Sequence, residues 1–270
     1  MRIVLHLDCK INNSLPLNYN YQLSSAIYNL LRFGSPEFSS FLHNSGFKID
    51  GKTYKLFTYA LRFDKVEILN NYFILKSSKV TLHISSPLID SFIKNFVIGT
   101  FENKSIEIAD KHKSINFKII SAEILPEPVF TNKMKFILLS PMILSTLKEY
   151  NGKKQQYYLR PEDTDDINRV LTKNLLNKKG LLKRNQTINE YCNLIWDEEY
   201  IKKKKRITKK ITINENGRFP IDVIGMQAPF TIEGDPELIK VGYECGFGEK
   251  NSMGFGMAEE INNYKQKIKK

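Results

Sequence analysis

Residues 241–257 read Val-Gly-Tyr-Glu-Cys-Gly-Phe-Gly-Glu-Lys-Asn-Ser-Met-Gly-Phe-Gly-Met and form the most distinctive stretch of the chain. Lys250, Asn251 and Ser252 lie among its five glycines. Glycine-rich backbone can approach phosphate closely and direct N–H groups at it. The stretch lacks the third glycine of the dinucleotide fingerprint and the Gly-Lys-Ser/Thr of a P-loop. Taken alone, it fits an anion-binding loop and an ordinary glycine-rich hairpin equally well.

The chain around this stretch shows the same order of predicted elements twice. Alternating apolar residues predict a strand at 2–8, and apolar residues at helical spacing predict a helix at 19–32. The first half continues with strands at 55–63, 72–75 and 79–84, a helix at 87–98, and strands at 105–109 and 115–124. The second half predicts a strand at 134–139, a helix at 162–178, strands at 200–213 and 219–227, a helix at 236–241 and a strand at 255–261. This order predicts an α+β fold of two tandem ferredoxin-like (βαββαβ) domains, residues 1–126 and 127–270.

A second, short helix is predicted directly after the first. Ser35 can cap it, Pro36 suits its first position and Gly46 ends it, which places His43 in its last turn. A histidine at a helix C-terminus feels the negative end of the helix dipole, which favours the imidazolium form.

The composition favours a polyanionic partner. The chain of 270 residues has 41 Lys and Arg against 29 Asp and Glu, a net charge of +12. Nucleic acid, acidic protein and anionic membrane all attract such a chain. The sequence shows no membrane span and no signal peptide, so we expect a cytoplasmic protein. Cys9, Cys192 and Cys245 are too few and too far apart for a disulfide framework or paired zinc ligands, which predicts buried, reduced thiols.

Residues 241–257 closely resemble the C-terminal glycine-rich loop of CRISPR repeat endoribonucleases of the RAMP superfamily. Residues 26–29, 41–43 and 55–61 resemble the active-site half of the same family, in the same order. The resemblance implies tandem ferredoxin-like folds and processing of a guide-RNA precursor, with CRISPR repeat RNA as the partner. Other CRISPR effector subunits and a second copy of the chain remain open as further partners.

The matched positions place Tyr28, His43 and Lys55 as candidate catalytic residues. RNA carries its own nucleophile, the 2′-hydroxyl beside each phosphodiester. Cleavage then needs a base, an acid for the departing 5′ oxygen and cations around the phosphorane, and it leaves a 2′,3′-cyclic phosphate. Each residue also has an ordinary structural explanation, because Tyr28 can simply pack, His43 can cap a helix, and Lys48 or Lys52 can replace Lys55.

A catalytic metal is not expected. The tight acidic group, Glu162, Asp163, Asp165 and Asp166, falls in the first turn of a predicted helix, where carboxylates favour the dipole. No pair of histidines has ligand spacing. We therefore predict no metal and no cofactor.

Residues 202–213 are rich in lysine and predict a strand with a cationic stripe on one side. Such a stripe can follow an RNA backbone, although a solvated edge that discourages aggregation is the alternative. The predicted RNA-binding residues are Lys202, Lys204, Arg206, Lys210, Gly246, Gly248, Lys250, Asn251, Ser252, Gly254 and Gly256.

Two other functions compete with repeat cleavage. A non-catalytic RNA-binding protein of the same fold would keep the glycine-rich stretch and the basic surface without cutting, and a cleavage assay separates the two. A small-molecule enzyme would use the stretch for a nucleotide phosphate, which the net charge of +12 disfavours.

Overall fold

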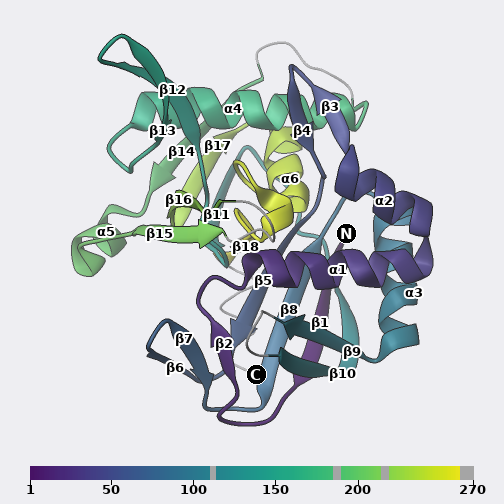
Figure 1. The fold of residues 1–270 in the computed structure, drawn as a ribbon. Helices are drawn as coiled ribbons and strands as arrows, with labels where there is room; N and C mark the ends of the chain where they lie inside the picture. Colours follow the sequence, from purple (N-terminus) through teal and green to yellow (C-terminus); the bar gives the residue numbers. More distant parts are fainter. Residues whose placement is uncertain (110–113, 185–189, 214–218, 262–270) are drawn as a thin grey trace.

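A computed structural model describes residues 1–109, 114–184, 190–213 and 219–261. It contains two larger antiparallel sheets, each packed against helices (Figure 1). The first sheet draws its strands from residues 2–125 and the second from residues 133–260. The domain boundary proposed after residue 126 falls between these two sets of strands.

The first sheet and its helices follow the ferredoxin-like order. They are β1 (Arg2–Asp8), α1 (Asn20–Gly34), β5 (Thr58–Phe63), β8 (Lys79–Ser85), α3 (Lys94–Asn103), β9 (Ser105–Ala109) and β10 (Ser114–Leu125). The strand order is β5-β8-β1-β10-β9, with every neighbouring pair antiparallel. Leu23 and Ile27 of α1 and Phe96 of α3 share one buried core with Ile3 and Leu5 of β1. The helices therefore cover the sheet as the alternating and helical patterns predict.

Shorter elements decorate this half. They are β2 (Ser14–Pro16), α2 (Pro36–Asn44), β3 (Phe47–Ile49), β4 (Lys52–Tyr54), β6 (Val66–Leu69), β7 (Tyr72–Leu75) and the short π-helix η1 (Ile89–Ile93), which leads into α3. α2 begins as predicted, because the Ser35 hydroxyl accepts a 3.1 Å hydrogen bond from the Phe38 amide and Pro36 is the first residue. β3 and β4 pair as a hairpin directly after α2.

The second sheet repeats the order. Its elements are β11 (Lys133–Leu138), α4 (Thr164–Leu181), β14 (Cys192–Trp196), β17 (Phe230–Gly234), α6 (Pro236–Cys245) and β18 (Ala258–Glu260). The strand order is β14-β17-β11-β18, again antiparallel throughout. The predicted α+β fold with two tandem ferredoxin-like sheets is confirmed.

The prediction that the strands at 200–213 and 219–227 belong to this sheet was wrong. Residues 198–204 form α5 (Glu198–Lys204), while β15 (Thr208–Ile213) and β16 (Ile221–Met226) pair with each other in a separate hairpin. β14 and β17 are the strands that belong to this sheet, and their residues Leu194 and Ile232 are buried in the hydrophobic core of the second half.

A further hairpin, β12 (Ser145–Tyr150) and β13 (Lys153–Tyr158), projects from the second half and was not predicted. Its turn is Asn151-Gly152, and both residues have positive φ, 50° and 71°. Asn-Gly is the preferred sequence of a two-residue hairpin turn, so the signal was present in the sequence.

The glycine-rich stretch joins the two halves. The turn η2 (Asn251–Met253) lies next to β5 and α1, and the Thr58 hydroxyl donates a 3.0 Å hydrogen bond to the Phe255 carbonyl. At the other end of the contact, the Arg2 guanidinium lies 3.8 Å from the Tyr243 ring centroid and donates to the Tyr243 carbonyl. The glycine-rich stretch is therefore held against the first sheet.

The three cysteines, Cys9, Cys192 and Cys245, are buried and free, as predicted. Among the described helices, none has both the length and the apolar character needed to cross a membrane.

Candidate active site

One face of α1 holds the glycine-rich stretch. Asn20 and Ser24 are four residues apart and donate hydrogen bonds of 2.8 and 2.9 Å to the carbonyls of Met253 and Ser252. Tyr28 is four residues further along, so its side chain faces the same stretch. Burial raises the pKa of the Tyr28 hydroxyl, and the neighbouring Ser252 side chain lowers this pKa only in part. Tyr28 is therefore a neutral hydroxyl at physiological pH.

His43 lies in the last turn of α2, as predicted, and meets Tyr28 directly. The two ring centroids are 5.2 Å apart in an edge-to-face arrangement. His43 Nδ1 lies 3.0 Å from Asn44 Oδ1, and the Asn44 amide donates to Ser40 at 3.2 Å. In the tautomer where Nδ1 donates to Asn44, Nε2 of the exposed ring carries the lone pair that a substrate can use.

Lys55 completes the group, because its ammonium donates a 2.9 Å hydrogen bond to the His43 carbonyl at the end of α2. Burial, and then the positive charge of Lys48, lowers the pKa of Lys55. Gly46 leaves room for this side chain: it has φ +59°, and a Cβ there would lie 2.9 Å from Lys55 Cδ. The ammonium thus satisfies a helix-terminal carbonyl next to the exposed imidazole.

The two alternative lysines lie differently. Lys52 forms a 3.5 Å ion pair with Glu249, and Lys48 is an exposed residue of β3. The geometry therefore favours Lys55 as the lysine that accompanies His43.

The glycines of the stretch are required by close packing. Gly246, Gly248, Gly254 and Gly256 all have positive φ and are buried. A Cβ at Gly256 would lie 1.9 Å from the Phe247 carbonyl oxygen, and one at Gly248 would lie 2.3 Å from a backbone oxygen of the neighbouring chain segment. Contacts of these four glycines with RNA stay a prediction. Lys250 and Ser252 are only half-buried, and both lie on an open surface of the molecule.

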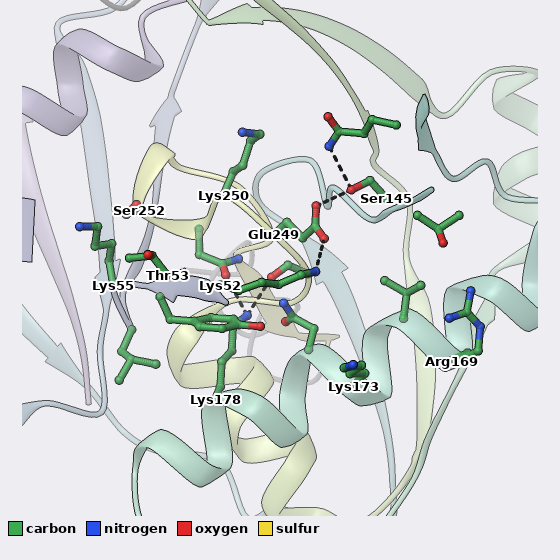
Figure 2. A pocket seen from close by; sticks show the side chains of 18 of the residues that line it. Lys52, Thr53, Lys55, Ser145, Arg169, Lys173, Lys178, Glu249, Lys250 and Ser252 are labelled. Carbon is green, nitrogen blue, oxygen red and sulfur yellow. Dashed lines mark hydrogen bonds and ion pairs between the residues drawn. The ribbon is translucent and has the colours of Figure 1, made fainter. Parts of the chain in front are cut away.

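That surface is a cleft of about 700 Å³ between β4, the start of β12, α4 and the glycine-rich stretch (Figure 2). Its walls include one acidic side chain, Glu249, and six cationic ones: Lys52, Lys55, Arg169, Lys173, Lys178 and Lys250. Figure 2 shows Lys55 and Ser252 at one end and Arg169 at the other. Lys55 connects this end of the cleft with the Tyr28–His43 pair, because it donates to the His43 carbonyl and the His43 ring contacts the Tyr28 ring.

Glu249 ties the walls of the cleft together. One carboxylate oxygen accepts a 2.7 Å hydrogen bond from Ser145 of β12, and the other pairs with Lys52 of β4. Glu249 therefore links β12, β4 and the glycine-rich stretch, which all line the cleft.

The cationic stripe predicted on one strand was wrong in its geometry. Lys202 and Lys204 lie on α5, Arg206 lies between elements, and Lys210 alone is on β15, in a 2.7 Å ion pair with Asp222. The sequence contains signals for this helix, because acidic residues occupy its first turn and lysines its last. Asp197 is its N-cap, and the Asp197 side chain accepts a hydrogen bond from the Tyr200 amide. A role of these residues in RNA binding stays a prediction.

Arg169, Lys173 and Lys178 were missed. They lie on α4, and Arg169 and Lys173 are one helical turn apart, so the spacing in the sequence could have identified this cationic face. The acidic residues at the start of α4 form ion pairs instead of a ligand cluster, since Asp163 pairs with Lys148 at 3.3 Å and Asp166 with Arg169 at 2.6 Å. Among the described residues, no three His, Cys, Asp or Glu side chains are grouped to hold a metal ion.

Two family models cover most of the chain. The model "CRISPR associated protein Cas6, C-terminal" matches residues 125–260, and "CRISPR-associated protein Cas6, N-terminal" matches residues 14–119.

Individual relatives are similar to this chain over most of their length. The chain is 34% identical over 274 residues to "CRISPR-associated endoribonuclease Cas6 1" of Methanocaldococcus jannaschii, covering 100% of this chain and 96% of the relative. It is 27% identical over 250 residues to "CRISPR-associated endoribonuclease Cas6" of Pyrococcus furiosus, covering 92% and 84%. A solved structure titled "CRISPR associated protein Cas6" matches with a TM-score of 0.71 and 31% identity, covering 96% of this chain and 98% of that one. These matches show that the chain belongs to the Cas6 family of CRISPR-associated proteins.

Proposed function

We propose that this Cas6-family endoribonuclease binds a CRISPR repeat RNA in the cationic cleft and cuts it once beside Tyr28, His43 and Lys55. The observation that carries the proposal is that the Tyr28 and His43 rings are in contact beside Lys55, which lines the cleft and donates to the His43 carbonyl, although the three residues are far apart in the sequence. An imidazole can act as acid or base, and an ammonium and a neutral hydroxyl can stabilise the phosphorane, as transesterification of RNA requires.

Each group has a role that follows from its surroundings. The exposed His43 imidazole can accept the 2′ proton or deliver a proton to the departing 5′ oxygen. The Lys55 ammonium offers positive charge to the phosphorane from beside the same helix end. The Tyr28 hydroxyl, kept protonated by burial, can donate a hydrogen bond to a phosphate oxygen.

Cleavage is expected to continue in excess chelator and to leave a 2′,3′-cyclic phosphate on the upstream product. The reason is that the proposed nucleophile is the 2′-oxygen and the proposed positive charge is that of Lys55, so no step needs a metal-activated water. Mass spectrometry of the upstream fragment, with and without chelator, checks both points. A product ending in a 3′-hydroxyl would contradict the proposed chemistry.

The cleft also makes a prediction about binding. Replacing Arg169 and Lys173 together by Gln should weaken repeat RNA binding and flatten its salt dependence. The slope of log K against the logarithm of the salt concentration should fall by about 0.7 for each phosphate that the protein no longer neutralises. The control variant neutralises Lys202, Lys204 and Arg206, which lie around α5, far from α2 in Figure 1.

We expect the smaller change in the control, because Arg169 and Lys173 line the cleft that leads to His43. Filter binding at several salt concentrations measures both slopes. A larger loss in the α5 variant would move the RNA path away from the cleft and back to the lysine-rich segment.

The non-catalytic alternative predicts the same binding without a cut. Incubation of the purified chain with a repeat RNA and with random RNA separates the two functions. One cut, in the repeat alone, supports the proposal, whereas tight binding with both RNAs intact would support the non-catalytic function.

A further inference from the structure

Lys178 is a buried lysine without a role in the chemistry described above. It lies in the last turn of α4 and is 1% exposed. Its ammonium donates three hydrogen bonds, to the Gly246 carbonyl at 2.7 Å, the Gly248 carbonyl at 2.8 Å and Asn251 Oδ1 at 2.8 Å. An ammonium has three N–H donors, so the three acceptors use its full capacity.

These acceptors lie on the limb of the glycine-rich stretch that enters the turn and on the first residue of the turn. Gly246 and Gly248 stand on either side of the buried Phe247, and Asn251 opens the turn η2. The Asn251 amide in turn donates to the Phe255 carbonyl at 3.0 Å. Lys178, labelled in Figure 2, therefore binds the limb that enters the turn directly, and Asn251 links it to the limb that leaves the turn.

The turn connects this lysine with the candidate active site. Ser252 follows Asn251, and its side chain lies near enough to the Tyr28 hydroxyl to influence the pKa of that hydroxyl. The carbonyl of Ser252 is held by Ser24 of α1. Asn251 and Ser252 are thus fixed by Lys178 from one side and by α1 from the other, so displacement of the turn on the α4 side would carry Ser252 away from Tyr28.

We propose that Lys178 is a positioning residue for RNA cleavage: its three-donor ammonium holds Asn251 and Ser252 in place against Tyr28, and loss of one donor releases the turn. The proposal rests on the proposed function and deepens it, since it assigns Tyr28 a partner whose position is controlled from the second half of the chain.

Protonation of Lys178 falls within an accessible pH range. Burial lowers its pKa to about 8, while the negative charge of Glu249 in the same stretch acts in the opposite direction. The neighbouring Cys245 thiol is neutral at this pH, because burial raises its own pKa to about 12. A neutral amine has two N–H donors for three acceptors, so one oxygen loses its partner above this pH.

Deprotonation of Lys178 weakens its bonds to the turn, but the same titration makes the folded chain more stable relative to the unfolded chain as the pH rises. The pKa of Lys178 is about 8 in the folded chain against 10.5 for an ordinary lysine, so the unfolded chain binds the proton more tightly. The contribution of this group to stability therefore rises as pH increases from about 8 to about 10.5. Loss of activity in this range through Lys178 would occur without global unfolding from the same titration.

The test compares Lys178→Met with Lys179→Met. Lys179 is the matched control because it is on the same helix, is also 1% exposed, and pairs with Glu190 at 2.8 Å and Asp235 at 3.7 Å instead of the glycine-rich stretch. Single-turnover cleavage of repeat RNA at saturating protein, followed from pH 6 to pH 10, gives the rate and its pH profile. Hydrogen exchange of the Phe247, Met253 and Gly254 amides, which are hydrogen-bonded within the stretch, gives its order without RNA.

Lys178→Met should lower the single-turnover rate by roughly 10²-fold, the usual cost of a small misplacement in an active site, and remove the ionisation near pH 8 from the profile. Protection of the three amides should fall by roughly 10-fold or more, since bonds to a charged donor are lost. Lys179→Met should keep the wild-type rate profile and the wild-type protection of the stretch.

Three results would overturn the proposal: unchanged amide protection in Lys178→Met, an unchanged rate and pH profile, or equal losses in Lys179→Met. If the wild-type chain cuts no repeat RNA, the proposed function fails, and the amide exchange still decides whether Lys178 holds the stretch. If Lys178→Met does not fold, exchange in the wild-type chain is followed from pH 7 to pH 9.5. Protection of the stretch that is constant after correction for intrinsic exchange would then reject the proposal.

Discussion

A repeat RNA with deoxyribose only at the nucleotide before the scissile phosphate is expected to remain uncut at that phosphate. Tyr28, His43 and Lys55 can position and polarise the phosphate, yet none of them attacks phosphorus in the proposed mechanism. The 2′-oxygen is the nucleophile, so its removal leaves the site without one. Single-turnover assays with the all-ribose and the singly substituted RNA measure the effect.

Binding of the substituted RNA should be almost unchanged. We expect the cationic cleft, with Arg169, Lys173 and Lys250, to contact RNA mainly through its phosphates. Losing one hydroxyl costs at most about one hydrogen bond, 0.5–1.5 kcal/mol. A deoxyribose placed several nucleotides away is the control, and it should be cut normally. Cleavage of the test RNA at the same phosphate and near the normal rate would remove all three residues from the proposed roles, because a metal-activated water tolerates the missing hydroxyl.

Local patterns predicted most of the fold because they reflect local physics. The alternation at residues 2–8, the Ser35–Pro36 helix start and the position of His43 all agree with the structure. Prediction failed in the second half, where a lysine-rich run was assigned to a strand. Two signals compete there, since Asp197 and the charges of residues 198–204 favour a helix, whereas Ile211 and Ile213 favour a strand.

The candidate site was predictable only in part. Family resemblance gave Tyr28, His43 and Lys55, and the structure places them together, but the resemblance could not give their contacts. Lys178 is 68 residues from Gly246 in the sequence, and nothing local distinguishes it from the exposed lysines of the chain. Its burial is decided by the packing of α4 on the glycine-rich stretch, which is a long-range property.

His43→Ala is expected to slow the single-turnover rate of repeat cleavage by roughly 10²–10⁴-fold, the usual value of a positioned acid or base, while the Kd for RNA changes little. The ring is exposed, and its loss leaves the Lys55 bond to the residue-43 carbonyl in place, because that bond uses the backbone. The substitution therefore removes proton transfer without removing the cationic cleft or the fold.

His6→Ala is the matched control for this prediction. His6 is 44% exposed and lies on β1, paired with Glu123 of β10 at 3.4 Å, so its loss removes an imidazole from another part of the surface. A wild-type rate in His6→Ala together with a slow His43→Ala would assign the proton transfer to the end of α2. An unchanged single-turnover rate in His43→Ala would take His43 out of the chemistry. Tyr28 and Lys55 would then be left without an imidazole partner, and the acid and base would have to come from the RNA or from water held in the cleft.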